Sequence, residues 1–240
     1  MKIKRSSELL WLLGLLFVAL GVALCSKADL GVSMVAAPAF ILADFFSPLL
    51  KWMSVGVMEY LVEGVLFLFL LVVIRRFNWR YLLSFAFAVL YGYVLDFFLF
   101  LTQGITVNSL LGHWGLLILG DIFVAFGVAC FFRTYLPLQV YELFVAEVAN
   151  RFSFSINKVK WIFDISLLAL SLLLAFLLFG DFNTFDWSAV GYTSFHSLGL
   201  GTLFTTLINS PLIALMGRLA DWLFEPTPRF PKLQKILKRS

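Results

Sequence analysis

The stretch Phe17–Ser33, FVALGVALCSKADLGVS, is written a second time along the chain, as FVAFGVACFFRTYLPLQ at Phe123–Gln139. At this offset of 106 residues, seven positions are identical. A second match follows in the same order, between SVGVMEYLVEG (Ser54–Gly64) and SINKVKWIFDI (Ser155–Ile165). Two matches in the same order, each with a charged residue in an apolar setting, indicate an internal duplication. The fold is therefore expected to contain two related halves.

The composition indicates that lipid is the solvent for most of the chain. Of the 240 residues, 62% are hydrophobic and 13% are charged, and the mean hydropathy is +0.98. A water-soluble domain of this size needs more charge to cover its surface. The net charge of +4 does not indicate nucleic acid as a partner. The basic residues cluster at the termini and between predicted helices, which is typical of membrane orientation.

Six apolar runs are long enough, at about 20 residues each, to span a bilayer. They are residues 8–26, 55–74, 81–101, 114–132, 159–179 and 190–216, and the last is long enough to be bent or tilted. The predicted fold is an all-α membrane protein with six transmembrane helices in two three-helix repeats. The repeats cover residues 1–106 and 107–225, and residues 226–240 form a basic cytoplasmic tail. The third helices match only in size and position, when Leu90–Phe98 (LYGYVLDFF) is laid on Ile208–Met216 (INSPLIALM).

The connections between the spans predict the orientation of the chain. Lys and Arg concentrate before span one, between spans two and three, between spans four and five, and after span six. Lys27 and Lys51 are the only basic residues on the other side. By the positive-inside rule, both termini are expected in the cytoplasm. Because each copy crosses the membrane three times, the second copy is expected to be inverted, with a two-fold axis in the membrane plane.

Two connecting segments, residues 29–52 and 135–154, are too apolar to be free loops. Each is predicted to hold a short helix after a break, at Gly31 in the first copy and at Pro137 in the second. In the second segment the apolar residues suit one face of a helix, with Glu142 and Asn150 elsewhere. Two interpretations are open. The short helices lie at the membrane interface, or they dip partway into the membrane, where protein or a cavity must satisfy their backbone.

Charged residues inside the predicted spans are the main candidates for a binding site, because an ionised group in hydrocarbon costs a few kcal/mol or more. Glu59 and Glu63 lie one helical turn apart on span two, and the duplication places Lys160 and Asp164 at the equivalent positions of span five. One hypothesis pairs Glu59 with Lys160 across the two-fold axis and leaves Glu63 and Asp164 as binding or coupling carboxylates. The alternative places Glu59 and Lys160 near helix ends, where they reach the headgroups.

Four further charged residues have two interpretations each. Asp96 on span three and Asp121 on span four are either proton-relay carboxylates or structural acids that bond to a tyrosine or to the backbone. Lys27 and Arg133 end the paired helices at opposite faces. They either complement the dipole of a helix C-terminus or attract an anionic group to one mouth of a central path. In the second case the neutral hydrogen-bonding groups are Ser33 and Gln139.

The two copies share a recognisable arrangement. An apolar helix ends in a basic residue, a short turn follows (Lys27–Ser33, KADLGVS, in the first copy), and the next helix begins with Ser-Val-Gly (Ser54–Gly56) or Ser-Ile. This arrangement resembles the YczE/YitT-like bacterial membrane proteins over nearly the whole chain. Members often carry Gly-Pro after the turn, where this chain has Ser33-Met34 and Gln139-Val140. The resemblance implies a six-helix integral protein of the bacterial plasma membrane, and it supports the fold more than an activity.

These observations predict a secondary transporter or permease for a small polar or anionic solute, working by alternating access between the two halves. The alternative is a non-transporting membrane module, such as an accessory or substrate-capture subunit or a scaffold. The sequence carries no phosphate-binding glycine loop, zinc signature or nucleophile elbow, and Cys25 and Cys130 lack metal-ligand spacing. No enzymatic activity, cofactor or metal is therefore expected. The expected partners are the lipid bilayer and the solute, with a homodimer or a partner membrane protein as a further option.

Overall fold

The computed structural model describes residues 3–180 and 197–237. Six of the helices in this part of the chain are long and apolar enough to cross a membrane, which confirms the predicted all-α membrane fold. They are α1 (Ser7–Lys27), α3 (Val55–Ile74), α4 (Arg80–Leu101), α5 (Leu110–Phe131), α7 (Ile156–Phe179) and α8 (Leu200–Leu223). Their outer faces expose leucine, valine and phenylalanine side chains, as expected where the solvent is lipid.

Serine caps explain why several helices begin where they do. Ser54 Oγ accepts a hydrogen bond from the Val57 backbone N–H at 3.3 Å, and Ser155 Oγ accepts one from Lys158 at 3.4 Å. Each bond satisfies one of the backbone donors that a helix leaves unpaired at its N-terminus. The repeated serine thus begins α3 and α7 alike. Span five begins at Ile156 rather than Val159, so Lys160 lies inside the helix.

The last span differs most from its prediction. Helix α8 begins at Leu200 and ends at Leu223, whereas the apolar run predicted residues 190–216. Residues 190–196 lie outside the described residues. At its other end the helix continues through Arg218 and Asp221, and the Asp221 carboxylate accepts two hydrogen bonds from Arg133, just beyond the end of α5.

The two short helices are enclosed by protein. They are α2 (Ala37–Phe46) and α6 (Val140–Phe152), and each follows the first span of its repeat, as predicted. The chain that leads into α2 is buried from Leu30 to Met34, and α6 begins with the buried residues Val140–Leu143. A broken segment is tolerated at membrane depth where protein surrounds it. The start of each short helix therefore meets the condition that a partly inserted position requires, which is enclosure by protein.

Helices α1 and α5 carry the duplicated sequence and cross at a very short distance. A Cβ atom on Gly21 would lie 2.5 Å from the Gly120 carbonyl oxygen, and one on Gly127 would lie 2.6 Å from the Gly14 carbonyl oxygen. At the offset of 106 residues, Gly14 corresponds to Gly120 and Gly21 to Gly127. The two contacts therefore exchange equivalent positions, and the helices run antiparallel. A two-fold axis between the copies predicts this pattern.

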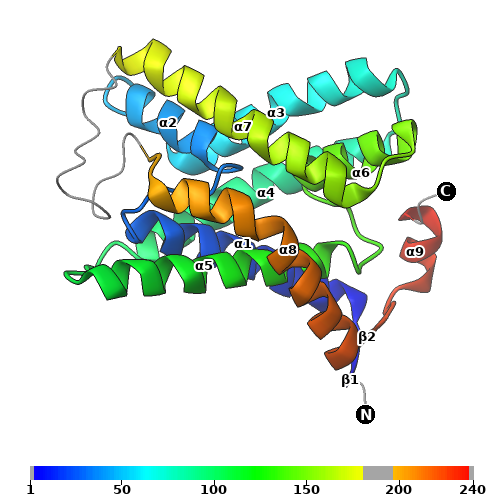
Figure 1. Ribbon diagram of the computed structural model, residues 1–240. Helices are drawn as coiled ribbons and strands as arrows, with labels where there is room; N and C mark the ends of the chain where they lie inside the picture. Colours follow the sequence, from blue (N-terminus) through cyan, green and yellow to red (C-terminus); the bar gives the residue numbers. More distant parts are fainter. Residues whose placement is uncertain (1–2, 181–196, 238–240) are drawn as a thin grey trace.

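Helices α2, α3, α6 and α7 form a second layer over this pair (Figure 1). In that layer α2 packs on both α3 and α7, and α6 packs on both α7 and α3, so each short helix joins the two predicted repeats. Helix α8 packs on α5, and α4 contacts both α1 and α3. Helices α2 and α6 lie at opposite ends of the molecule in Figure 1, while the two termini lie at the same end.

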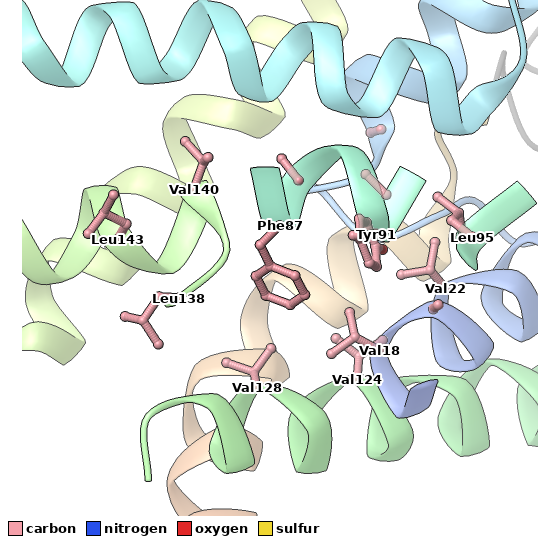
Figure 2. Packing of buried hydrophobic residues seen from close by; sticks show 14 of the residues in the cluster. Val18, Val22, Phe87, Tyr91, Leu95, Val124, Val128, Leu138, Val140 and Leu143 are labelled. Carbon is pink, nitrogen blue, oxygen red and sulfur yellow. The ribbon is translucent and has the colours of Figure 1, made fainter. Parts of the chain in front are cut away.

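An apolar core fills the space between the layers (Figure 2). Phe87 and Tyr91 of α4 lie over the valines of α1 and α5. The core also includes residues from the start of α6 and the turn before it. The labelled members are Val18, Val22, Phe87, Tyr91, Leu95, Val124, Val128, Leu138, Val140 and Leu143. Cys25 and Cys130 are both buried and free.

The two ends of the chain are held together. Strand β1 (Ile3–Ser6) pairs in parallel with β2 (Phe224–Thr227), and the short helix α9 (Pro231–Leu237) follows. The Glu8 carboxylate accepts hydrogen bonds from the backbone N–H groups of Arg229 and Phe230 and from the Tyr135 hydroxyl. Burial and the neighbouring Glu8 raise the pKa of Tyr135 to about 12, so its hydroxyl stays a proton donor at neutral pH.

Candidate functional site

A small polar cavity lies at the junction of the two layers. Its volume is about 30 Å³, measured as the space open to the centres of water molecules, which is room for about two of them. Valines of α1 and α5 form one wall. Charged and polar side chains from the other elements form most of the rest, together with Val35 and Ala36. The lining residues are Val18, Val22, Ser33, Val35, Ala36, Glu59, Tyr91, Val124, Val128, Gln139, Tyr141, Glu142, Lys160 and Asn209.

These fourteen residues are seven pairs of equivalent positions in the two sequence copies. The offset of 106 residues relates five pairs, the second match relates one, and the overlay of the third spans relates the last. The pairs are Val18 and Val124, Val22 and Val128, Ser33 and Gln139, Val35 and Tyr141, Ala36 and Glu142, Glu59 and Lys160, and Tyr91 and Asn209. A two-fold axis that passes through the cavity predicts such a lining, because each copy then contributes the same positions.

Glu63 holds the broken segment that leads into α6. Its Oε1 accepts a hydrogen bond from Gln139 Nε2 at 2.7 Å, and its Oε2 accepts one from the Val140 backbone N–H at 3.1 Å. Gln139 is the N-cap of α6 and Val140 its first residue, so the carboxylate also faces the positive end of the helix dipole. Both oxygens of Glu63 thus bond to the protein, and the side chain is fully buried.

Lys160 forms its ion pair within its own helix. Its Nζ lies 3.1 Å from Asp164 Oδ1, one turn further along α7. The hypothesis of an ion pair between Lys160 and Glu59 is therefore wrong, because the four-residue spacing brings Asp164 within reach on the same helix face. The alternative, in which Glu59 and Lys160 reach the headgroups, is also wrong, because they are only 1% and 7% exposed.

Several polar atoms near the cavity have no partner within the described residues. They are Glu59 Oε2, Glu142 Oε2, Tyr141 Oη and Asn209 Oδ1, and all four side chains line the cavity. Asp164 Oδ2 and Ser210 Oγ lie near one another without the geometry of a hydrogen bond. Buried acceptors in folded proteins normally have donors. The cavity wall is therefore rich in hydrogen-bonding capacity that the protein itself does not use.

Residues 3–218 match the model of DUF6198, a family of unknown function. The chain belongs to DUF6198. No curated protein and no solved structure matches the chain. The DUF6198 match covers helices α1 to α7 and most of α8, and it therefore includes every residue that lines the cavity. It excludes β2 and α9.

In this DUF6198 chain, Glu142 and Asn209 are site residues that the sequence did not single out. The helix pattern placed Glu142 away from the apolar face of α6. In the structure α3 and α7 pack on α6 and leave Glu142 only 6% exposed. The sequence did contain a signal for Asn209, because the weak alignment of the third spans makes it equivalent to Tyr91.

The basic residues at the ends of the duplicated helices lie outside the cavity lining. Arg133 pairs with Asp221 through two bonds of 2.6 Å and donates a hydrogen bond to the Ala129 carbonyl oxygen at 3.0 Å. This arrangement fits the predicted cap of a helix C-terminus, and the nearby carboxylate compensates the charge. Lys27 is the last residue of α1, in the same position relative to its helix dipole.

Asp96 and Asp121 also lie outside the cavity lining. Asp96 accepts hydrogen bonds from the Gly56 backbone N–H at 2.8 Å and from Ser54 Oγ at 2.5 Å. It therefore stabilises the N-terminus of α3, which fits the structural interpretation. Asp121 is buried on α5, and its Oδ1 has no hydrogen-bond partner within the described residues. His113 is buried in the first turn of α5 with Nδ1 2.7 Å from the Ala28 carbonyl oxygen. The other histidine of the chain, His196, lies outside the described residues.

Proposed function

We propose that this protein is a secondary transporter of a small polar or anionic solute, working by alternating access between two inverted halves. The observation that carries the proposal is the lining of the cavity by seven pairs of equivalent positions. Transporters with inverted repeats bind their solutes at the interface between the repeats, near the middle of the membrane and beside broken helices. The breaks before α2 and α6 contribute Ser33 and Gln139 to this lining.

The layered packing supports a route for the conformational change. Helices α2, α3, α6 and α7 form one layer, and α1 and α5 form the core of the other, with the cavity between them. Rocking of one layer against the other opens the cavity first to one side of the membrane and then to the other. The protein is proposed to lie in the bacterial plasma membrane with both termini in the cytoplasm, as the distribution of Lys and Arg supports.

The acidic residues of α3 and α7 have two roles in this mechanism. Glu59 contacts the solute, because it lines the cavity and keeps one oxygen free of protein donors. Glu63 and Asp164 are the coupling carboxylates, since both are buried next to the cavity wall and each bonds to one of its residues, Gln139 and Lys160 respectively. A change in the protonation of either carboxyl group changes the strength of its bond to that residue.

The experiment is solute uptake by purified protein in liposomes, followed with a panel of radiolabelled small cations, zwitterions and anions. Uptake by the unmodified protein is expected for one class, and Glu59→Gln, Glu63→Gln and Asp164→Asn are expected to abolish it. Glu147→Gln is the matched control, because Glu147 lies on α6 and does not line the cavity. Retained uptake in all three variants rejects these residues as the transport site.

One observation favours the non-transporting alternative. The glycine contacts bring the backbones of α1 and α5 together, so this part of the midline is closely packed. A scaffold or an accessory subunit needs such rigidity and no path for a solute. Two results together would support the scaffold or accessory-subunit function. No solute class is transported, and another membrane protein co-purifies in constant ratio.

A further inference from the structure

Three acceptor atoms in the cavity wall have no donor within the described part of the chain. Glu59 Oε2, Glu142 Oε2 and Asn209 Oδ1 make no hydrogen bond, although the side chains are only 1%, 6% and 2% exposed. A buried acceptor that lacks a donor loses the free energy of its hydration. The three side chains come from α3, α6 and α8 and line one cavity. A single ligand with several donors in that cavity satisfies all three.

Carboxyl groups outnumber basic groups in the wall of the cavity. Glu59 and Glu142 line the wall together with Lys160, whose ammonium group is paired with Asp164. Among the described residues, neither glutamate lies within ion-pair distance of a lysine or arginine. Opposite charges attract strongly where water is scarce, and like charges repel. The wall therefore favours a cation and disfavours an anion.

The protein already stabilises one buried ammonium group in the wall of the cavity. The Lys160 side chain is 7% exposed, and its Nζ donates to Asp164 Oδ1 at 3.1 Å. Glu59 occupies the position equivalent to Lys160 in the other sequence copy, so a carboxylate faces the cavity there instead of an ammonium group. A free ammonium ion in the cavity would give Glu59 and Glu142 the kind of donor that Lys160 gives Asp164.

We propose that the cavity binds a small monovalent cation with several N–H donors, of the size of ammonium or methylammonium, and that Glu59, Glu142 and Asn209 accept its hydrogen bonds. The small volume of the cavity, about 30 Å³, suits a ligand of a few non-hydrogen atoms. A chelated metal ion fits less well, because within the described residues no three His, Cys, Asp or Glu side chains converge on one point. This inference rests on the proposed function, because it names the solute class of the same site.

The test is calorimetric titration of the purified full-length protein in detergent with methylammonium chloride. Saturable binding to one site per chain is expected. Tetramethylammonium chloride and tetramethylammonium phosphate are expected not to bind, because the tetramethylammonium ion has no N–H donor and phosphate is an anion. Equal binding of tetramethylammonium, or binding of phosphate in place of methylammonium, would overturn the proposal.

The variants locate the site. Glu59→Gln and Glu142→Gln are each expected to weaken methylammonium binding by about tenfold or more, which corresponds to the loss of a hydrogen bond to a charged group. Asn209→Ala removes a neutral acceptor and is expected to weaken binding less. Glu147→Gln on the same helix as Glu142 is expected to bind as the unmodified protein does, and gel filtration of each variant checks its fold. Unchanged affinity in all three cavity variants contradicts the site.

Binding and transport fail separately. Methylammonium binding without uptake into liposomes overturns the proposed transport and leaves the cation site standing. Uptake of an anion by a protein that does not bind methylammonium overturns the cation site and leaves transport standing.

Discussion

The close crossing of α1 and α5 gives the sharpest prediction for stability. In Gly120→Ala the new Cβ atom would lie 2.6 Å from Cys25 Sγ, 2.7 Å from the Gly21 carbonyl oxygen and 3.0 Å from the Cys25 backbone nitrogen. Two of these atoms belong to the backbone of α1, so the helices must separate. Overpacking of this kind costs about 1–3 kcal/mol, and alanine recovers up to about 1 kcal/mol of helix propensity. We expect a net loss of about 2 kcal/mol.

Gly115 on the same helix provides the control, because a Cβ atom there meets nothing within 4 Å. Gly115→Ala is expected to be neutral or to gain up to about 1 kcal/mol. Gly14→Ala, at the position equivalent to Gly120, is expected to fall between the two, since its Cβ atom meets a ring carbon of Phe131 at 2.8 Å and a carbonyl oxygen at 3.0 Å. Unfolding by dodecyl sulfate in mixed micelles, followed by far-ultraviolet circular dichroism, measures the order. A Gly120→Ala protein as stable as Gly115→Ala would refute the close crossing.

Three further variants test individual contacts by the same unfolding assay. Asp164→Asn leaves the buried Lys160 ammonium group without its carboxylate, and we expect the free energy of unfolding to fall by about 3–5 kcal/mol. Adding Lys160→Met is expected to recover much of this loss. A double variant as unstable as Asp164→Asn alone would contradict this. Asp96→Ala removes the acceptor for the N-terminal donors of α3 and should cost about 0.5–2 kcal/mol. Arg133→Gln should cost less than about 1 kcal/mol, because the Asp221 side chain is 61% exposed, and a large loss would show that the pair is more than a surface contact.

The sequence was sufficient to predict the six spans and the two short helices, because the length of an apolar run reflects the thickness of the bilayer. It misplaced α8 because that helix carries Thr205, Thr206 and Asn209 and has the lowest hydropathy of the six spans. The helix also runs on to Leu223 past charged residues. Apolar content alone does not reveal that Arg133, nearly ninety positions earlier, compensates one of those charges.

The polar positions of the site were predicted better than their contacts. Glu59, Glu63, Lys160 and Asp164 are all buried, as charged residues within a span must be if they are to avoid lipid. Their partners depend on how far each helix is rotated and on which other element fills the space. Glu63 bonds to the start of α6, and that contact requires the tertiary packing of α3 against α6. No pattern in the local sequence encodes it.

The two copies provide equivalent positions to the cavity, but they do not provide equivalent charges. The valines of α1 and α5 are identical pairs, whereas Glu59 is matched by Lys160 and Glu142 by Ala36. In an alternating-access protein with identical halves, the two end states would have the same free energy.

Here Glu63 bonds to the break before α6, while Asp164 at the equivalent position bonds to Lys160. Under the proposed mechanism, the exchanged state requires Asp164 to leave Lys160 and bond to the break before α2. The charge difference between the copies therefore makes the free energies of the two states unequal. A cation that binds Glu59 and Glu142 has different contacts in each state. Such a difference is the condition for a solute to shift the equilibrium between the two states.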